Sequence, residues 1–108
     1  GVEVIFYDKA DGTKPAEDFI ASLDKGMRAK MTRAVIRLRD YGPALRRPLS
    51  APLGDGIFEL RAQFGSDISR VLYFFIVNGR AVLTHGFIKK TAKTPKNQIE
   101  LAKKYKKE

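Results

Sequence analysis

The segment 86–95 carries three lysines within five residues, at a point where an apolar run ends and a helix is expected to begin. They are Lys89, Lys90 and Lys93. Lysine ammonium groups are compact point charges, and three so close together repel one another unless a polyanion or solvent screens them. This spacing favours phosphate binding. The alternative is a solvated basic linker, and these residues alone support the two interpretations equally.

Two arginines add a second type of phosphate ligand. Arg61 lies in one β-type run and Arg70 opens the next, across a short turn. Side chains alternate between the faces of a strand, so Arg61 shares a face with Glu59 and Gln63, and the two guanidinium groups are expected near one sheet surface. Guanidinium groups bind phosphate oxygens in a bidentate manner. The alternative for each is an ordinary salt bridge, for example Arg61 with Glu59 or Asp67.

His85 is the chain's lone histidine and lies on the last β-type run. Strict alternation would place Ala81, Leu83 and Phe87 on its own face, which favours a core or partly buried position. Its unperturbed pKa nevertheless suits proton transfer near neutral pH, and it precedes the lysine run closely. Both interpretations stay open.

The composition excludes several classes of chemistry. The chain has no cysteine, so a disulfide, a thiolate metal site and cysteine catalysis are ruled out, and one histidine does not build a zinc site. No P-loop, Ser-His-Asp order or dinucleotide fingerprint occurs. We therefore expect no metal and no organic cofactor. The longest apolar run, 71–77, is far too short to cross a bilayer, and we expect a cytoplasmic protein without a membrane partner.

The charge is strongly positive and unevenly distributed. The net charge is +9 over 108 residues. Segment 89–108 has eight lysines against two glutamates, and segment 28–47 has seven basic residues against one aspartate, so each carries +6. Clustered positive charge implies a polyanionic partner, either nucleic acid or an acidic protein. On helix 24–41 the basic side chains lie off the apolar stripe, which fits a solvated face or a nucleic-acid contact.

The patterns of apolar residues predict one α+β domain over 1–108. A strand is expected at 2–7, a helix at 15–24, and a second helix capped by Asp24 and ended by Gly42 and Pro43, with a stripe from Met27 to Tyr41. Segment 44–55 has no periodicity and reads as a long loop. The order is thus β-α-α-β-β-β-α, with a helical hairpin on one face of a small, mainly antiparallel sheet and a C-terminal helix.

The second half of the chain supplies most of the sheet. Strands are expected at 57–64, 69–77 and 80–88, and Asn78-Gly79 between the last two is a strong signal for a type I′ hairpin. Run 71–77 is apolar on both faces, so its strand should be central and covered on both sides. The last helix should be capped by Thr94, with Pro95 at its first position.

Three segments in this order resemble the RelE/ParE toxin superfamily, and most closely its HigB-type, phage-derived branch. They are GIFELR (56–61), RVLYF (70–74) and HGFIKKT (85–91). The resemblance covers nearly the whole chain. It implies a toxin of a type II toxin–antitoxin pair that cleaves mRNA on the ribosome without a metal, by attack of the 2′-hydroxyl on the adjacent phosphate, and so inhibits translation.

The resemblance also implies roles for particular residues. Arg61 and Arg70 match the family's strand arginines and would stabilise the charge that develops on the phosphorane. Lys89 and Lys90 would bind the phosphate or activate the 2′-hydroxyl. The general acid is unassigned: Tyr105 and His85 are both candidates. Contacts to RNA would come from the two basic segments, and the residues expected to make them are Lys93, Arg46, Arg47, Arg37, Lys103 and Lys104.

The implied partners are the ribosome, mRNA and a cognate antitoxin, expected to be acidic and to carry a helix-turn-helix DNA-binding domain. A second interpretation is a ParE-like protein ligand that inhibits DNA gyrase without cleaving RNA. The two basic segments weakly favour the ribosome. A DNA-binding regulatory domain is a third interpretation, but no helix has the spacing of a helix-turn-helix.

Overall fold

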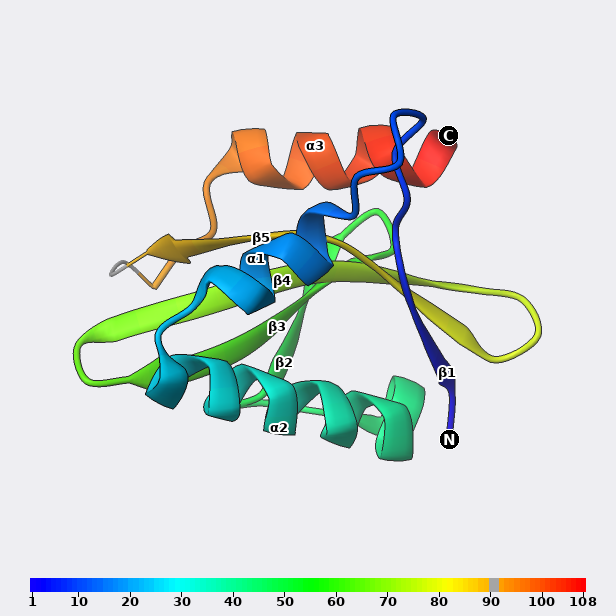
Figure 1. The fold of residues 1–108 in the computed structure, drawn as a ribbon. Helices are drawn as coiled ribbons and strands as arrows, with labels where there is room; N and C mark the ends of the chain where they lie inside the picture. The colour runs from blue at the N-terminus through cyan, green and yellow to red at the C-terminus, as the bar shows by residue number, and fades with distance from the viewer. Residues whose placement is uncertain (90–91) are drawn as a thin grey trace.

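The computed structural model describes residues 1–89 and 92–108. Its sheet has five strands in the order β1-β5-β4-β3-β2, in which β1 is parallel to β5 and every other pair is antiparallel (Figure 1). The elements in chain order are β1 (Glu3–Phe6), α1 (Pro15–Ser22), α2 (Lys25–Tyr41), the short 3-10 helix η1 (Gly42–Ala44), β2 (Ser50–Gly54), β3 (Ile57–Phe64), β4 (Asp67–Ile76), β5 (Arg80–Lys89) and α3 (Lys96–Lys107). The α+β prediction is confirmed.

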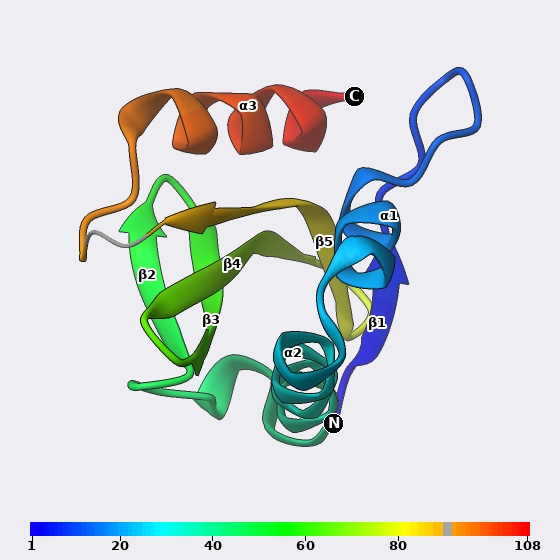
Figure 2. The same cartoon turned by 60° about the vertical axis from the view of Figure 1, so that its left-hand side comes forward.

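Helices cover the sheet on both sides, as Figure 2 shows: α1 and α2 lie on one side and α3 on the other. We call these the hairpin face and the α3 face. The central strand β4 serves both, because Val71 and Tyr73 pack in the core under the helical hairpin while Leu72 and Phe74 pack with Ala102 of α3. This confirms the prediction of a central strand covered on both sides.

The turn between β4 and β5 also agrees with the sequence. Asn78 and Gly79 both have positive φ, 71° and 70°. This is the left-handed conformation that a type I′ turn requires and that Asn-Gly adopts readily. The pairing of Ile76 with Arg80 leaves three residues in the connection, Val77, Asn78 and Gly79, one more than the sequence predicts.

The long loop predicted for 44–55 is wrong, because it contains β2. This strand pairs with β3 through the register Ser50↔Leu60 and Pro52↔Phe58 and forms an edge of the sheet. An edge strand tolerates proline, since one side of its backbone has no neighbour to bond. Pairing with β3, rather than any periodicity of its own, makes this segment a strand.

Two predicted helix details are also wrong. Tyr41 does not face the core but is 54% exposed, because it is the last residue of α2 and extends past the sheet. The last helix begins at Lys96 with Pro95 as its N-cap residue. Thr94 does not cap it, because the Thr94 hydroxyl is directed to Glu59 instead.

A β-bulge in β5 changes the side of the sheet on which His85 lies. The register between β4 and β5 shifts from Leu72↔His85 to Tyr73↔Leu83, so Thr84 is an extra residue in β5. His85 therefore lies on the α3 face, opposite Leu72, whereas Leu83 packs on the hairpin face. The prediction that His85 shares a face with Ala81 and Leu83 is wrong for this reason.

Candidate active site

The α3 face brings most of the sequence-predicted site residues onto one surface. Arg61 and Arg70 are direct cross-strand partners in the ladder between β3 and β4. Arg70 lies opposite Phe87 of β5, and two residues away Ile68 lies opposite Lys89. Residues two apart on a strand share a face, so the two arginines, His85 and Lys89 all belong to the α3 face.

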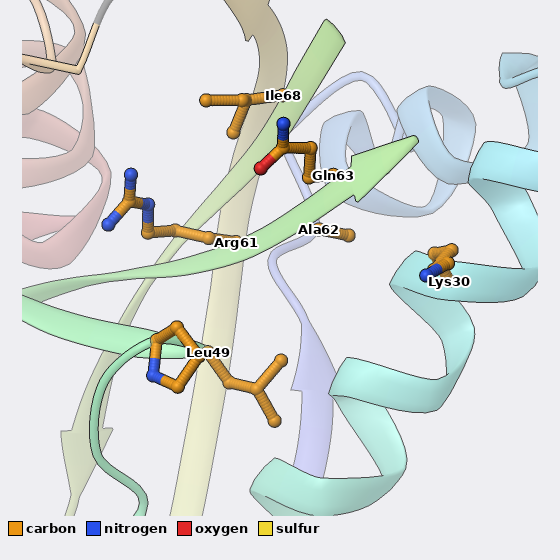
Figure 3. A pocket seen from close by; sticks show the side chains of 7 residues that line it. Lys30, Leu49, Arg61, Ala62, Gln63 and Ile68 are labelled. Atoms are coloured by element: carbon orange, nitrogen blue, oxygen red, sulfur yellow. The ribbon is translucent and has the colours of Figure 1, made fainter. Parts of the chain in front are cut away.

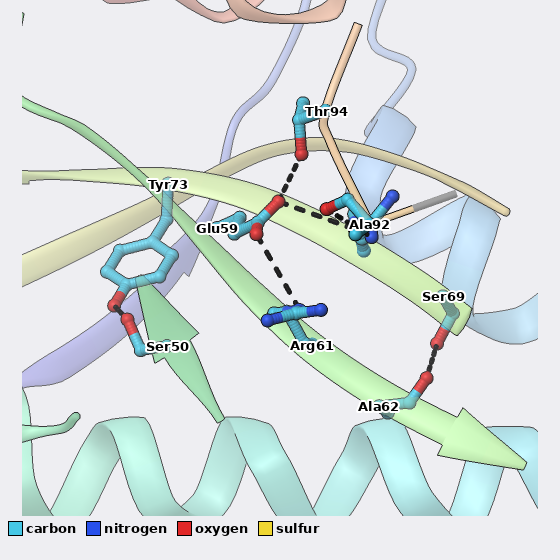
Figure 4. A network of polar contacts seen from close by, with 9 residues as sticks. Ser50, Glu59, Arg61, Ala62, Ser69, Tyr73, Ala92 and Thr94 are labelled. Atoms are coloured by element: carbon cyan, nitrogen blue, oxygen red, sulfur yellow. Dashed lines mark hydrogen bonds and ion pairs between the residues drawn. The ribbon is translucent and has the colours of Figure 1, made fainter. Parts of the chain in front are cut away.

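Glu59 is the centre of this arrangement (Figure 4). Its Oε2 lies 3.6 Å from Nε of Arg61, and its Oε1 lies 3.4 Å from Nε of Arg70. The hydroxyl of Thr94, on the segment that precedes α3, donates a hydrogen bond to Oε1. One carboxylate thus holds two guanidinium groups from neighbouring strands and also ties down the segment that leads into α3.

Arg70 is fully buried. Its side chain has no exposed surface, and Nη2 donates a hydrogen bond to the carbonyl oxygen of Ala92 at 3.0 Å. Burial lowers the pKa of Arg70, the Glu59 carboxylate counteracts this, and Arg61 adds a small lowering contribution. An arginine remains charged through such a shift, so Arg70 is a fixed positive charge behind the surface.

Arg61 reaches the surface at the edge of β3. Its side chain is 24% exposed and lines a groove of about 290 Å³, together with Leu49, Gln63 and Lys30 of α2 (Figure 3). β2 begins at Ser50, opposite Leu60, so at Arg61 β3 has β4 on one side and only the segment before β2 on the other. Arg61 is accessible at this edge of β3.

The lysine run lies at the exit of β5. Lys89 is the last residue of β5, and Lys89 and Lys93 are exposed. Lys90, the second lysine predicted to hold phosphate, lies outside the described residues. Lys89 is thus on the same face as the arginines, at the C-terminal end of β5.

The two ring nitrogens of His85 contact Gln98 and Thr84. Nε2 lies 2.8 Å from Oε1 of Gln98 on α3, and Nδ1 lies 3.1 Å from the hydroxyl of Thr84. With the amide oxygen of Gln98 as acceptor, Nε2 carries the ring proton. Burial lowers the pKa of His85, and the hydrogen bond to Gln98 raises it in part. In this arrangement His85 joins α3 to the sheet.

Tyr105, the other candidate acid, belongs to an aromatic cluster. Its ring stacks on Tyr7 at a centroid distance of 4.4 Å and meets His85 edge-on at 6.0 Å. The Tyr7 hydroxyl donates to the carboxylate of Glu108, which raises the pKa of Tyr7 to about 12. This cluster lies at the far end of α3 from Thr94 and the arginines.

The residues predicted to bind RNA fall on two separate surfaces. Arg37 is exposed on α2, and Arg46 and Arg47 are exposed in the segment that follows it, on the hairpin side of the sheet. Lys104 is exposed on α3, on the opposite side. Lys103 also lies on α3 but is paired, with Nζ 2.9 Å from Asp55 and 3.4 Å from Glu100.

Sequence reasoning missed the roles of Glu59 and Thr94. The sequence predicts Glu59 only as a salt-bridge partner of Arg61, although its position two residues earlier on the same strand face indicates a shared surface. Its burial depends on Arg70 and Thr94, which come from other elements. No signal local to Thr94 distinguishes a helix cap from a ligand of a distant carboxylate.

Two features are absent from the residues that the structure describes. No group of three or more histidine, aspartate and glutamate side chains in 1–89 and 92–108 is placed to hold a metal ion. Over the same residues, no helix combines the length and the apolar character that crossing a membrane requires.

Comparison with known proteins gives a family. No curated protein matches the chain. A family model described as "Phage derived protein Gp49-like (DUF891)" matches residues 18–107, from α1 to the last turn of α3, and so includes the whole polar cluster around Glu59. The resemblance to phage-derived relatives of RelE and ParE is confirmed at this level. The chain belongs to the Gp49-like phage-derived family, a family of toxin-like proteins related to the RelE/ParE-type toxins.

Proposed function

We propose that this chain is the toxin of a type II toxin–antitoxin pair, of the HigB type, and that it cleaves mRNA on the ribosome. The observation that carries the proposal is the direct pairing of Arg61 with Arg70 on adjacent strands, with Arg61 open to a groove. One guanidinium group at the surface, with a second one buried behind it, provides the positive charge that an RNA phosphate requires as it passes through its transition state.

The reaction needs no group beyond the RNA and the protein. The 2′-hydroxyl attacks the adjacent phosphorus, and the bond from phosphorus to the 5′-oxygen of the next nucleotide breaks. The 2′-hydroxyl loses its proton and the leaving 5′-oxygen gains one, so the products are a 2′,3′-cyclic phosphate and a 5′-hydroxyl. Negative charge accumulates on the non-bridging oxygens of the pentacovalent intermediate, which is where cations stabilise it.

The proposed roles follow the exposure of each side chain. Arg61 contacts the scissile phosphate directly, since its guanidinium lies at the surface. Arg70 acts as a fixed charge beneath it. Lys89, at the end of β5 on the same face, binds the scissile phosphate or an adjacent phosphate. His85 contributes to the placement of α3 rather than to proton transfer, because its two ring nitrogens are engaged by Gln98 and Thr84.

The proposed partners match the charge of the two basic surfaces. Ribosomal RNA and mRNA are polyanions, and surfaces on both sides of the sheet allow the domain to contact RNA on two sides. A cognate antitoxin with an acidic segment would compete for the same surfaces. For both kinds of partner, we expect binding to weaken as the salt concentration rises.

The test is cleavage of a defined mRNA on programmed ribosomes. Wild-type protein should give fragments with 2′,3′-cyclic phosphate ends. Arg61→Ala should lower the rate by about 100- to 1,000-fold, the usual cost of removing one charge-stabilising donor. Arg80→Ala is the matched control, because Arg80 is also a partly exposed strand arginine beside a glutamate, Glu3, at 3.3 Å. It should cleave at the wild-type rate.

Two results would contradict the proposal. One is wild-type protein that leaves mRNA intact on ribosomes but inhibits gyrase supercoiling, which would identify a ParE-like protein ligand. The other is equal loss of cleavage in Arg61→Ala and Arg80→Ala, which would mean that positive charge in general, and not the Arg61 position, supports the activity.

A further inference from the structure

We infer that Glu59 is a positioning residue of the proposed active site: it fixes the guanidinium of Arg61, whose side chain lines the candidate groove, and joins both strand arginines to the segment before α3. The catalytic meaning of this inference rests on the proposed function. Its structural content, that Glu59 fixes the direction of Arg61, stands separately and is tested separately below.

The contacts of Glu59 exclude a direct role with RNA in this arrangement. The side chain is 4% exposed, and both carboxylate oxygens are occupied, Oε2 by Arg61 and Oε1 by Arg70 and Thr94. A carboxylate enclosed in this way influences a bound phosphate only through the groups that it holds. Of these groups, Arg61 is the one that lines the groove.

The charges explain why a carboxylate is needed there. Arg61 and Arg70 are paired across adjacent strands, and like charges placed directly opposite each other destabilise a sheet. Arg70 is fixed by burial, so without Glu59 the repulsion would fall on Arg61, whose long side chain gains rotamer entropy by moving into solvent. Glu59 Oε2 lies 3.6 Å from Nε of Arg61, and on this inference the terminal nitrogens of Arg61 are the ones that contact the substrate.

The same carboxylate lowers the local positive charge. Two guanidinium groups and one carboxylate sum to +1 rather than +2. A site selected only for affinity toward RNA would be better without Glu59. Its presence therefore favours orientation over affinity, and this gives opposite expectations for binding and for the chemical step when the charge is removed.

The experiment compares Glu59→Gln, Glu59→Asp and Glu3→Gln in multiple-turnover cleavage on programmed ribosomes. Glu59→Gln keeps the size of the side chain and removes its charge. It should lower kcat about 10- to 100-fold, as misplacement of a positioned group does, while KM stays unchanged or falls. Glu59→Asp should restore part of kcat. Glu3→Gln removes the carboxylate of the exposed Arg80 pair and should match wild type.

A double-variant cycle identifies the residue through which Glu59 acts. If Glu59 works through Arg61, adding Glu59→Gln to Arg61→Ala should cause no further loss of rate. Multiplicative losses would overturn the inference, and so would a rise in KM with kcat unchanged. Thermal unfolding of each variant identifies loss of fold; if Glu59→Gln unfolds, the same comparison is made with Glu59→Asp, which must then lower kcat without raising KM.

A second measurement does not depend on cleavage. The NMR signal of the Arg61 Nε–Hε group should be sharp and protected from solvent exchange in wild type and in Glu3→Gln, and should exchange faster in Glu59→Gln. Unchanged exchange in Glu59→Gln would overturn the inference even for an active enzyme. If wild-type protein does not cleave RNA but its Arg61 signal responds as expected, the proposed function fails and the positioning role of Glu59 holds.

Discussion

The two faces of the sheet bury different kinds of side chain. The hairpin face packs the apolar side chains of α1 and α2 against those of the sheet in one large cluster. The α3 face has a smaller apolar cluster around Leu72 and Phe74, and beside it a buried polar cluster around Glu59. The domain thus separates an apolar face, which provides most of the stability, from a face where charged groups take core positions.

The difference between the two faces is clearest within β4. β4 is apolar on both faces at Val71, Leu72, Tyr73 and Phe74, but one residue earlier it places a buried arginine on the α3 face. Burying a charge is unfavourable unless it is paired and hydrogen-bonded. Glu59 is the ion-pair partner of Arg70, Ala92 accepts a hydrogen bond from it, and Thr94 donates to Glu59, so the polar cluster is assembled from three separate parts of the chain.

The largest effect should come from breaking this unit. Arg70→Ala should lower the free energy of unfolding by about 3–5 kcal/mol, the usual loss when one partner of a buried ion pair is removed. Urea denaturation followed by circular dichroism measures it. The double variant Glu59→Leu/Arg70→Met should recover much of this loss, because it leaves neither charge buried alone. A loss below about 1 kcal/mol for Arg70→Ala would mean that the α3 face does not depend on its charges.

The hairpin face should respond to loss of volume. Met31 of α2 has no exposed surface, so Met31→Ala should cost about 2–5 kcal/mol through lost burial and a residual cavity. The same truncation at Ile99 of α3, which is only partly buried, should cost less. Equal losses in denaturation experiments would remove the distinction between the faces.

An added methyl group should sharpen the comparison further. A Cβ at Gly86 would lie 2.2 Å from a ring carbon of Phe19 of α1, so Gly86→Ala forces this helix away from the hairpin face. We expect a loss of about 1–3 kcal/mol, as for other overpacked cores. Ile88→Ala, two residues further along β5 at an exposed position, should change stability by less than about 0.5 kcal/mol. Unchanged stability in Gly86→Ala would show that α1 packs loosely.

The smallest expected effect is on pH dependence. Because the pKa of His85 is lower in the folded protein than its ordinary value, about 6.5, the unfolded chain binds more protons as pH falls. Stability should therefore decrease as pH drops from about 6.5 to the pKa of the folded state, with a slope of at most about 1.4 kcal/mol per pH unit. His85→Gln should remove this contribution. An identical pH profile in wild type and variant would contradict it.

Local sequence features predicted the fold and half of the site. The short turn between β3 and β4 is enough to place Arg61 and Arg70 near each other, and the ladder confirms it. The Asn78-Gly79 turn and the doubly apolar run of β4 were recognised for the same reason: neighbouring residues specify them. These are the features for which sequence distance and spatial distance agree.

Features that depend on pairing between distant segments were not predictable. β2 is a strand because β3 lies beside it, and its own Pro-rich sequence indicates a loop. The bulge at Thr84 has no recognisable signal and reverses the face on which His85 lies. The polar cluster joins Glu59 to Thr94, 35 residues away, which no periodicity can show.

The proline in β2 has a consequence for how these molecules can associate. Pro52 lies on an edge strand and has no backbone N–H to offer a neighbour. A strand from another molecule that added along this edge would lose a hydrogen bond there, so pairing along β2 is less favourable than pairing along the other edge, β1. Continuous strand addition from chain to chain uses both edges of each sheet. Pro52 therefore opposes the growth of such an assembly at one of its two edges.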